Sequence, residues 1–265
     1  MRHAAGMLLL IAFCLPQHAL AFTDDEVRPI QARMQMLPPA ERIAAWAELF
    51  VGTPYDTDPL GTYVRREVIV ADDRVDCMYL TFRAMELALS ATPDEAKKKA
   101  LDLRFKTRGL LEGSRVVNYD ERYQDGADML DSGKYGHEIT ARLGRPTKIP
   151  APPGRPEVEL IPLETLRKAL SRLETGDIIF FIKDPSRRES GEIVAHMGFV
   201  KVESAGQSED RPPTPHVYLI HASGTKRRGG QVRKVLLDEY LSAAYHAGAR
   251  VTRISPESFQ SNPKN

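Results

Sequence analysis

The chain has 265 residues, of which 42% are hydrophobic, enough for one large domain or for a domain with an insertion. Its 37 Lys and Arg residues against 36 Asp and Glu residues give a formal net charge of +1 at pH 7. Nucleic-acid surfaces and polybasic membrane anchors need a clear excess of basic residues on one face. The charge balance therefore argues against nucleic acid as a partner and against a stable membrane anchor.

The first 21 residues have the pattern of a secretory signal peptide. A basic start at Arg2 precedes an apolar run at 7–15, and Ala19 and Ala21 are the small residues that a signal peptidase reads. The run is shorter than the ~20 apolar residues that cross a bilayer. We expect cleavage after Ala21 and an exported protein, periplasmic or secreted.

Cleavage discards Cys14 and leaves Cys77 as the single cysteine. One thiol forms no intramolecular disulfide, so burial must hold the fold together in an oxidising compartment. An unpaired thiol in such a compartment is easier to explain if it carries out chemistry. The alternative is a buried, inert thiol.

Helical patterns dominate the first part of the chain. Residues 22–50 form an N-terminal segment whose apolar spacing predicts two helices, broken at Pro38. A Val/Ile-rich stretch at 68–71 predicts a short strand. The next helix opens at Asp76, a plausible N-cap that places Cys77 in the first turn. One apolar stripe follows along this helix: Met78, Phe82, Met85 and Leu89.

The middle of the chain is less regular. A capping pattern at 92–95 predicts another helix, and residues 106–142 predict loops and short helices that line a cleft. Five prolines between residues 145 and 156 indicate an extended connector, which is followed by a short helix at 163–173.

The last third of the chain changes to strands. Residues 177–182, 192–202 and 216–222 are β-branched and aromatic, and they predict an antiparallel sheet. Residues 236–247 return to a helical pattern, residues 250–254 form a closing strand, and the tail from residue 255 is expected to be disordered. The sequence thus predicts an α+β fold with a catalytic domain at 51–254 and an insertion around 91–165.

Three residues form a minimal set for thiol chemistry: Cys77 as nucleophile, His196 as base and His221 as orienting group. Alternation along a strand gives both rings apolar neighbours, which are Val194, Gly198 and Val200 for His196, and Val217 and Leu219 for His221. A helix N-terminus and a nearby imidazole both favour thiolate over thiol. We therefore expect an ion pair in which His196 deprotonates Cys77 and the Cys77 backbone N–H stabilises the oxyanion.

Short motifs in a fixed order resemble the NlpC-type papain-like cysteine peptidase and amidase superfamily. They are GTPY at 52–55, DC at 76–77, GD at 176–177, AHMGFV at 195–200 and IHAS at 220–223. The segment RYQDG at 122–126 and the long stretch before the first histidine are most similar to the N-acetylmuramoyl-L-alanine amidase-like branch. The resemblance implies a papain-like core, in which the helix with the cysteine packs on an antiparallel sheet with the histidines, plus extra helices and insertions.

The same resemblance implies a cell-wall hydrolase that acts on amide bonds of peptidoglycan or muropeptides without a metal or cofactor. Cys77 matches the nucleophile, His196 the base and His221 the third polar residue of the family. Tyr55 matches a tyrosine beside the cleft, which implies a role in substrate binding or at the oxyanion site. Asp76 matches the acid before the nucleophile, which helps peptide-cutting relatives to bind the substrate's free amine.

The sequence departs from the family pattern in two places. Met78 and Tyr79 follow the nucleophile, where the family has small residues, and the hairpin tip at 204–215 is longer than usual. Asp76 is equally well explained as a helix cap and Tyr55 as a packing aromatic. The remaining histidines have no comparable support and are interpreted as surface or structural residues: His137, His216 and His246.

The function that we expect is hydrolysis of the N-acetylmuramoyl–L-alanine amide through a thioester acyl-enzyme. A γ-D-glutamyl-diamino acid endopeptidase and a non-catalytic peptidoglycan-binding protein are the alternatives. A zinc site made of Cys77, His196 and His221 is the chemical rival. The absence of close-spaced ligand pairs such as C-x-x-C argues against zinc.

Overall fold

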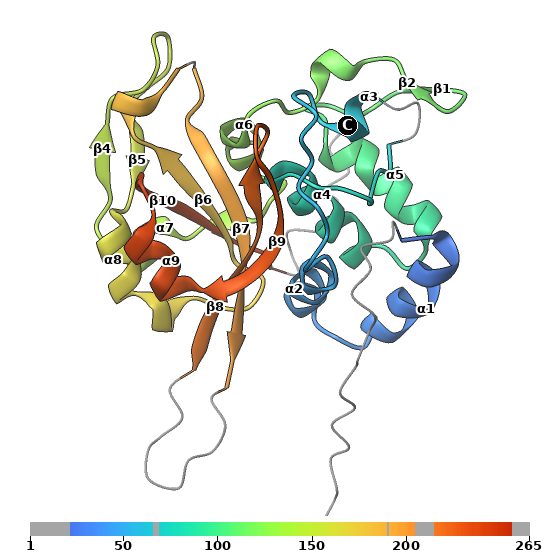
Figure 1. The fold of residues 1–265 in the computed structure, drawn as a ribbon, viewed down its shortest axis with the longest axis horizontal. Helices are drawn as coiled ribbons and strands as arrows, with labels where there is room; N and C mark the ends of the chain where they lie inside the picture. The colour runs from blue at the N-terminus through green and yellow to red at the C-terminus, as the bar shows by residue number, and fades with distance from the viewer. Residues whose placement is uncertain (1–21, 66–68, 190, 205–214, 256–265) are drawn as a thin grey trace, which may run out of the picture.

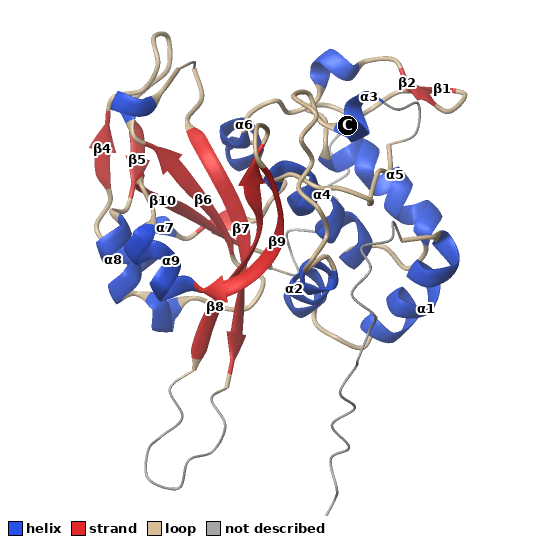
Figure 2. Ribbon diagram, viewed as in Figure 1, coloured by secondary structure: helices blue, strands red, loops and turns tan. Residues whose placement is uncertain are grey.

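The computed structural model describes residues 22–65, 69–189, 191–204 and 215–255. The expected signal peptide, most of the hairpin tip and the expected disordered tail lie outside these ranges. The fold is α+β, as predicted: a group of helices covers one face of a twisted antiparallel sheet, and smaller helices lie on the other face (Figures 1 and 2).

The N-terminal half supplies the larger helical layer. Its helices are α1 (Asp24–Met34), α2 (Pro39–Leu49), α3 (Thr62–Arg65), α4 (Cys77–Ala88) and α5 (Pro93–Leu103). Thr23 closes a capping box with Glu26 at the start of α1, and Thr92 caps α5. The predicted pair of helices before residue 50 and both later helices are confirmed.

Short elements connect this layer to the sheet. They are β1 (Leu111–Glu112), β2 (Arg115–Val116), η1 (Tyr119–Glu121), α6 (Gly126–Asp131), β3 (His137–Glu138), α7 (Thr140–Leu143), β4 (Thr147–Ile149), β5 (Val158–Leu160), α8 (Leu163–Lys168) and η2 (Leu170–Arg172). The prediction of short helices and loops in this region is confirmed.

The main sheet has the order β3-β10-β6-β7-β8-β9, and its neighbouring strands are antiparallel. Its long strands are β6 (Ile178–Lys183), β7 (Val194–Glu203), β8 (His216–Thr225), β9 (Gly229–Leu236) and β10 (His246–Arg253), with η3 (Pro185–Arg187) and α9 (Leu237–Ala243) between them. The three strands predicted at 177–222 are confirmed.

Three details differ from the sequence prediction. Strand β9 and the short strands β1 to β5 were not predicted. The helix expected at 236–247 is wrong beyond Ala243, because His246 already pairs with Lys183 as β10 begins. No strand forms within the described residues 69–71, where the Ala71 N–H donates to the Tyr79 hydroxyl instead of to a neighbouring strand.

Two hydrophobic clusters hold the sheet from opposite sides. The helical cluster joins α1, α2, α4, α5 and α6 to one face of the sheet, and Cys77 packs against it. The outer cluster joins α7, α8 and α9 to the other face. Helix α2 contributes Ile43 and Trp46 to the helical cluster, so the N-terminal segment shares a core with α4.

Strands β7 and β8 pair over only part of their length and then diverge. They pair from Phe199↔Ile220 to Glu203↔His216. Beyond this ladder, in the part of the chain that the structure describes, residues 194–198 pair only with β6 and residues 221–225 only with β9. The N-terminal end of α4 meets the sheet where these two strands diverge.

Candidate active site

Cys77 is the first residue of α4, and local chemistry fixes this helix start. The Asp76 side chain accepts a hydrogen bond of 2.8 Å from the Tyr79 backbone N–H, as an N-cap does. The backbone N–H of Met197 donates a hydrogen bond to the Cys77 sulfur. Because Met197 directly follows His196, the thiol meets the sheet beside the predicted base.

The two predicted histidines meet directly across the divergence of β7 and β8. Nε2 of His196 and Nδ1 of His221 are 2.7 Å apart, a distance that requires one shared proton between the two rings. With Nε2 engaged, Nδ1 is the His196 nitrogen that remains to take a proton. Among the described residues no hydrogen bond joins the sulfur to either ring, a looseness common in ligand-free thiol sites.

A β-bulge changes the strand parity next to His196. Phe181 pairs with His196, whereas Ile182 pairs with Val194, which leaves Ala195 as the extra residue. Val194 consequently packs in the helical cluster. The prediction that Val194 and His196 share a face is therefore wrong.

Burial sets the protonation states of the site. It raises the pKa of the Cys77 thiol to about 12, helped by the Asp76 carboxylate and opposed by the Met197 N–H and the Lys226 ammonium. Burial also lowers the pKa of His196 well below 6.5 and that of His221 to about 4, the latter helped by Arg233. These shifts favour a neutral thiol and a neutral imidazole in the resting site instead of the expected thiolate–imidazolium pair, because desolvation is the largest influence on both groups.

The two predicted substrate-binding residues, Tyr55 and Asp76, also lie beside Cys77. Burial raises the pKa of Tyr55, and the neighbouring Cys77 and Asp76 raise it further. The Tyr55 backbone N–H donates to the Gly230 carbonyl at 2.8 Å, which ties the Tyr55 loop to the β8–β9 hairpin. The five residues singled out from the sequence are thus gathered around one thiol.

Three further residues belong to this neighbourhood and were not predicted. Lys226 forms an ion pair of 2.9 Å with Asp76, and Tyr240 of α9 packs against both histidine rings, 6.3 Å from His196 and 5.0 Å from His221 between ring centroids. The Tyr240 hydroxyl lies 3.2 Å from Nε2 of His246, which was interpreted as a surface or structural residue. No local sequence signal identifies these residues, since strand pairing and helix docking bring them in.

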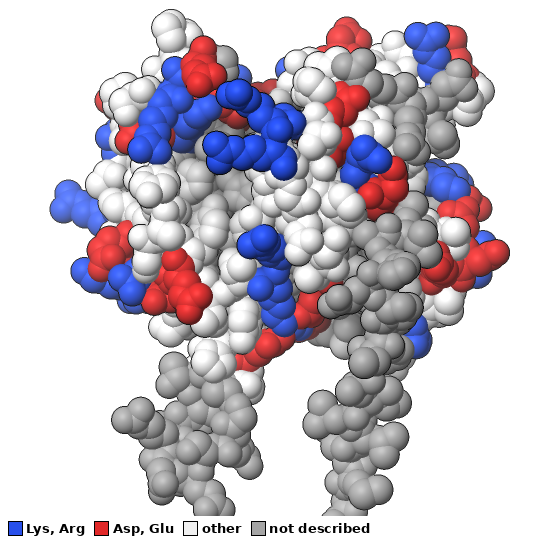
Figure 3. All heavy atoms as spheres, in the orientation of Figure 1, with Lys and Arg blue, Asp and Glu red and all other residues white. Residues whose placement is uncertain are grey.

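A cleft of about 390 Å³ opens beside Tyr240. It is lined by Lys183, Arg187, Ala195, Tyr240, Ala243, Ala244, Tyr245 and His246. Figure 3 shows Lys and Arg side chains gathered along the border of a hollow on this face, over the tip of the β8–β9 hairpin. The cleft has the size of a small-molecule site, and Arg187 and Lys183 stand in a lining that is otherwise uncharged. Lys183 is already paired with Glu192 at 2.6 Å.

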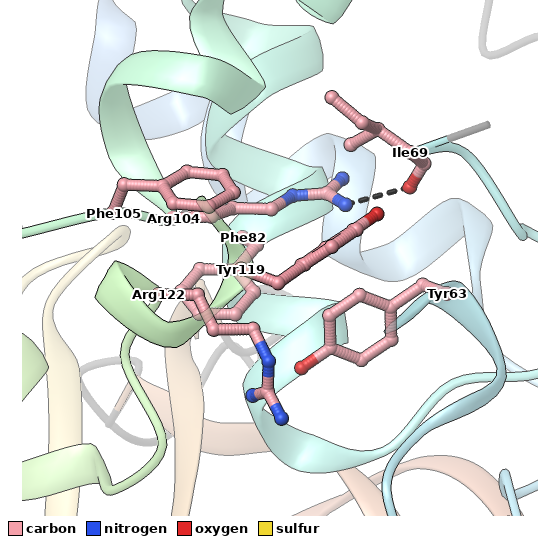
Figure 4. Close-up of a pocket in the computed structure, with 7 residues that line it drawn as sticks. All are labelled: Tyr63, Ile69, Phe82, Arg104, Phe105, Tyr119 and Arg122. Carbon is pink, nitrogen blue, oxygen red and sulfur yellow. Dashed lines mark hydrogen bonds between the residues drawn. The ribbon is translucent and has the colours of Figure 1, made fainter. Parts of the chain in front are cut away.

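A second cavity, behind α4, is structural. Its volume is about 10 Å³, room for one water at most, and it is lined by Tyr63, Ile69, Phe82, Arg104, Phe105, Tyr119 and Arg122 (Figure 4). Arg104 donates two hydrogen bonds to the buried Glu86 carboxylate, of 2.6 and 2.7 Å, and one of 2.6 Å to the Ile69 carbonyl. Arg83 pairs with the buried Asp72 in the same layer.

For the zinc alternative, Nε2 of His196 and Nδ1 of His221 point at each other and share a proton, which leaves one nitrogen of each ring for any other partner. Within residues 22–65, 69–189, 191–204 and 215–255, no cluster of three or more His, Cys, Asp and Glu side chains has the arrangement of a metal site. Over the same ranges, none of the helices has the length and apolarity that a membrane span requires.

Comparison with known proteins finds similarity at the level of structure. No family model matches the chain, and no curated protein matches it. An N-acetylmuramoyl-L-alanine amidase from Bacteroides uniformis ATCC 8492 is 19% identical with a TM-score of 0.57, covering 80% of this chain and 97% of the amidase. A DUF1460 protein from Legionella pneumophila str. Philadelphia 1 is 15% identical with a TM-score of 0.62, covering 86% and 93%.

A third similar structure carries a different name. A putative xylanase from Bacteroides fragilis is 20% identical with a TM-score of 0.58, covering 80% of this chain and all of that one at 100%. The TM-scores of these three structures show a shared α+β architecture. At identities of 15 to 20% they show the fold alone, so the chemistry has to be argued from the site. The chain therefore has the fold of an N-acetylmuramoyl-L-alanine amidase from Bacteroides uniformis and of a DUF1460 protein.

Proposed function

We propose that this protein is an exported cysteine amidase that hydrolyses an amide bond of peptidoglycan or its fragments. The bond is that between the lactyl group of N-acetylmuramic acid and L-alanine. The observation that carries the proposal is the 2.7 Å contact between His196 and His221 beside a thiol at the start of a helix. This is the arrangement of nucleophile, base and orienting group that thiol hydrolysis needs.

The mechanism starts from the neutral pair. As the Cys77 sulfur attacks the amide carbonyl, its proton passes to Nδ1 of His196, and the tetrahedral oxyanion accepts a hydrogen bond from the Cys77 backbone N–H. His196 then protonates the leaving amine, and a thioester remains. Water, deprotonated by the same ring, hydrolyses the thioester and returns the thiol. His221 holds the Nε2–H tautomer of His196 throughout.

The guanidinium of Arg187 supports a substrate with a stem peptide. Stem peptides carry carboxylates at their glutamyl and diamino acid residues, and Arg187 lines the cleft next to Tyr240. The name of the amidase from Bacteroides uniformis supports the same class of substrate by analogy. The xylanase name finds no support in the site, because a retaining or inverting glycosidase needs a pair of carboxylates across the cleft.

Mass analysis of products tests the proposed bond. The purified protein is incubated with N-acetylmuramoyl-L-Ala-γ-D-Glu-diaminopimelate, and we expect the free saccharide acid and the intact tripeptide. The Cys77→Ala protein should release neither, at least ~10³-fold below the parent rate. Cleavage after γ-D-Glu would replace the amidase by the endopeptidase alternative. Equal product release by Cys77→Ala would reject the thiol mechanism.

A further inference from the structure

We propose that Lys226 determines specificity by occupying the Asp76 carboxylate beside the nucleophile, so that the site accepts amides with an uncharged acyl side and rejects those that carry a free ammonium group there. The inference deepens the proposed function and rests on it. A lactyl amide has no charge on its acyl side. A stem peptide that is cut after γ-D-Glu presents the free ammonium group of L-alanine on that side.

Both oxygens of Asp76 are already engaged. Oδ1 accepts the Tyr79 backbone N–H at 2.8 Å, and Oδ2 accepts the Lys226 ammonium at 2.9 Å. The exposed fraction of the Asp76 side chain is 13%, against 33% for Lys226. The neighbouring carboxylate, Asp56, is buried and accepts hydrogen bonds from Asp58 and Thr62. A substrate ammonium group therefore finds no free carboxylate next to Cys77.

The hairpin holds Lys226 in this position. Thr225 and Gly229 close the β8–β9 turn around it, and the Lys226 ammonium lies 5.8 Å from the centre of the Tyr55 ring. The hairpin and the Tyr55 loop are in such close contact that a Cβ on Gly224 would lie 2.5 Å from Cγ of Tyr55. Pro54 forms a bridge with Gln231 across the same contact. The hairpin that carries Lys226 is thus fixed against the Tyr55 loop, and the ion pair with Asp76 holds the ammonium group in place.

The charge of Lys226 acts on the Cys77 thiol as well as on Asp76. It opposes the effect of Asp76 on the thiol, because it lowers the pKa of Cys77 while Asp76 raises it. A second ammonium group at this point would meet like-charge repulsion instead of a partner. Without Lys226, the same carboxylate becomes an attractive site for an ammonium group.

Protection of Cys77 against iodoacetamide tests the inference without requiring turnover. The ligands are L-Ala-γ-D-Glu, which has a free amine, and its N-acetylated form. In Lys226→Met we expect the free-amine peptide to protect at a concentration about 10-fold lower than in the parent, since an unmasked ion pair contributes on the order of a tenfold change in affinity. The concentration at which the acetylated peptide protects Cys77 should change little.

Arg227→Met is the matched control, because Arg227 is exposed in the same turn and its loss removes the same charge without uncovering Asp76. It should behave like the parent. Equal protection by the free-amine peptide in the parent and Lys226→Met, or no protection in either, would overturn the inference. Muropeptide hydrolysis measured on the same proteins reports separately on the proposed function, which fails only if that hydrolysis is absent.

Discussion

The protonation state of two side chains decides how the site works. The thiol pKa is raised to about 12 and the His196 pKa is lowered well below 6.5, so sulfur and imidazole are both neutral at pH 7. The proton therefore moves during attack on the substrate. Burial keeps the thiol protonated in the resting site, Asp76 adds to that effect, and Lys226 opposes it. Such a site protects its nucleophile from oxidants, because the thiolate is the reactive form.

The pH dependence of kcat/KM follows from these shifts. A base with a lowered pKa stays neutral, and therefore active, below the ordinary imidazole value of 6.5. We expect the acid limb of the profile well under pH 6.5, and His196→Ala should abolish turnover. The exposed His216 on the same strand as His221 provides the control, His216→Ala, with an unchanged profile. An acid limb centred at pH 6.5 or higher would contradict the neutral-pair assignment.

At the residue scale, the sequence singled out the residues that the structure brings together and missed their surroundings. Cys77 and the two histidines stand out because they are the residue types of thiol catalysis in a recognisable order. Lys226 lies 150 positions from Asp76, and only the pairing of β8 with β9 brings them together. The sequence predicted a thiolate–imidazolium pair of Cys77 and His196, and it missed the neutral state because the burial of these two side chains depends on how the whole chain packs.

At the element scale, the junction between β7 and α6 positions the base. Gly126 begins α6, and a Cβ there would lie 2.5 Å from Cε of Met197 and 2.7 Å from Cγ1 of Val194. Val194 is β-branched and held in the sheet, so it cannot move aside cheaply. Absence of a side chain at Gly126 therefore lets α6 approach the segment that carries His196.

Gly126→Ala should displace this segment. We expect a loss of about 1–3 kcal/mol in the free energy of unfolding, from overpacking, and a fall in kcat larger than the change in KM. Urea denaturation and steady-state kinetics measure the two effects. Gly191→Ala is the control, since a Cβ at the exposed Gly191 would contact nothing within 4 Å. Parent-like kinetics for Gly126→Ala would show that the contact does not position His196.

Elements with strong local signals were predictable, whereas edge elements were not. The stretch Ile178–Lys183 is apolar and central, and its β-branched residues mark it as a strand. Strand β9 is the outer strand of the sheet, partly exposed, and its Gly and charged residues weaken the alternation. The helix expected through residue 247 ends early because the backbone of β10 finds its partners in β6.

At the scale of the whole molecule, buried charges tie α4 to its neighbours. The side chains of Arg83 and Arg104 are 2 and 3% exposed, and their carboxylate partners on Asp72 and Glu86 are fully buried. The Arg104 guanidinium also lies 5.0 Å from the centre of the Tyr79 ring. Because α4 begins at Cys77, this network also holds the helix that carries the thiol in place.

Glu86→Gln should destabilise the whole fold. It leaves the Arg104 charge buried without its bidentate partner, which costs about 3–5 kcal/mol in typical buried pairs. Chemical denaturation followed by circular dichroism measures the free energy of unfolding. Asp238→Asn, which breaks the exposed pair with Arg167, should have a smaller effect. Comparable losses in both variants would mean that burial does not set the strength of the network.

The candidate active site lies between the helical cluster and the outer cluster. The sulfur belongs to the helical cluster, whereas the imidazoles face Tyr240 and the outer cluster. Ribosomal synthesis delivers the nucleophile early and both histidines late. On the proposed function, a growing chain therefore has no complete site until its final strands have docked, and activity appears only in the finished molecule.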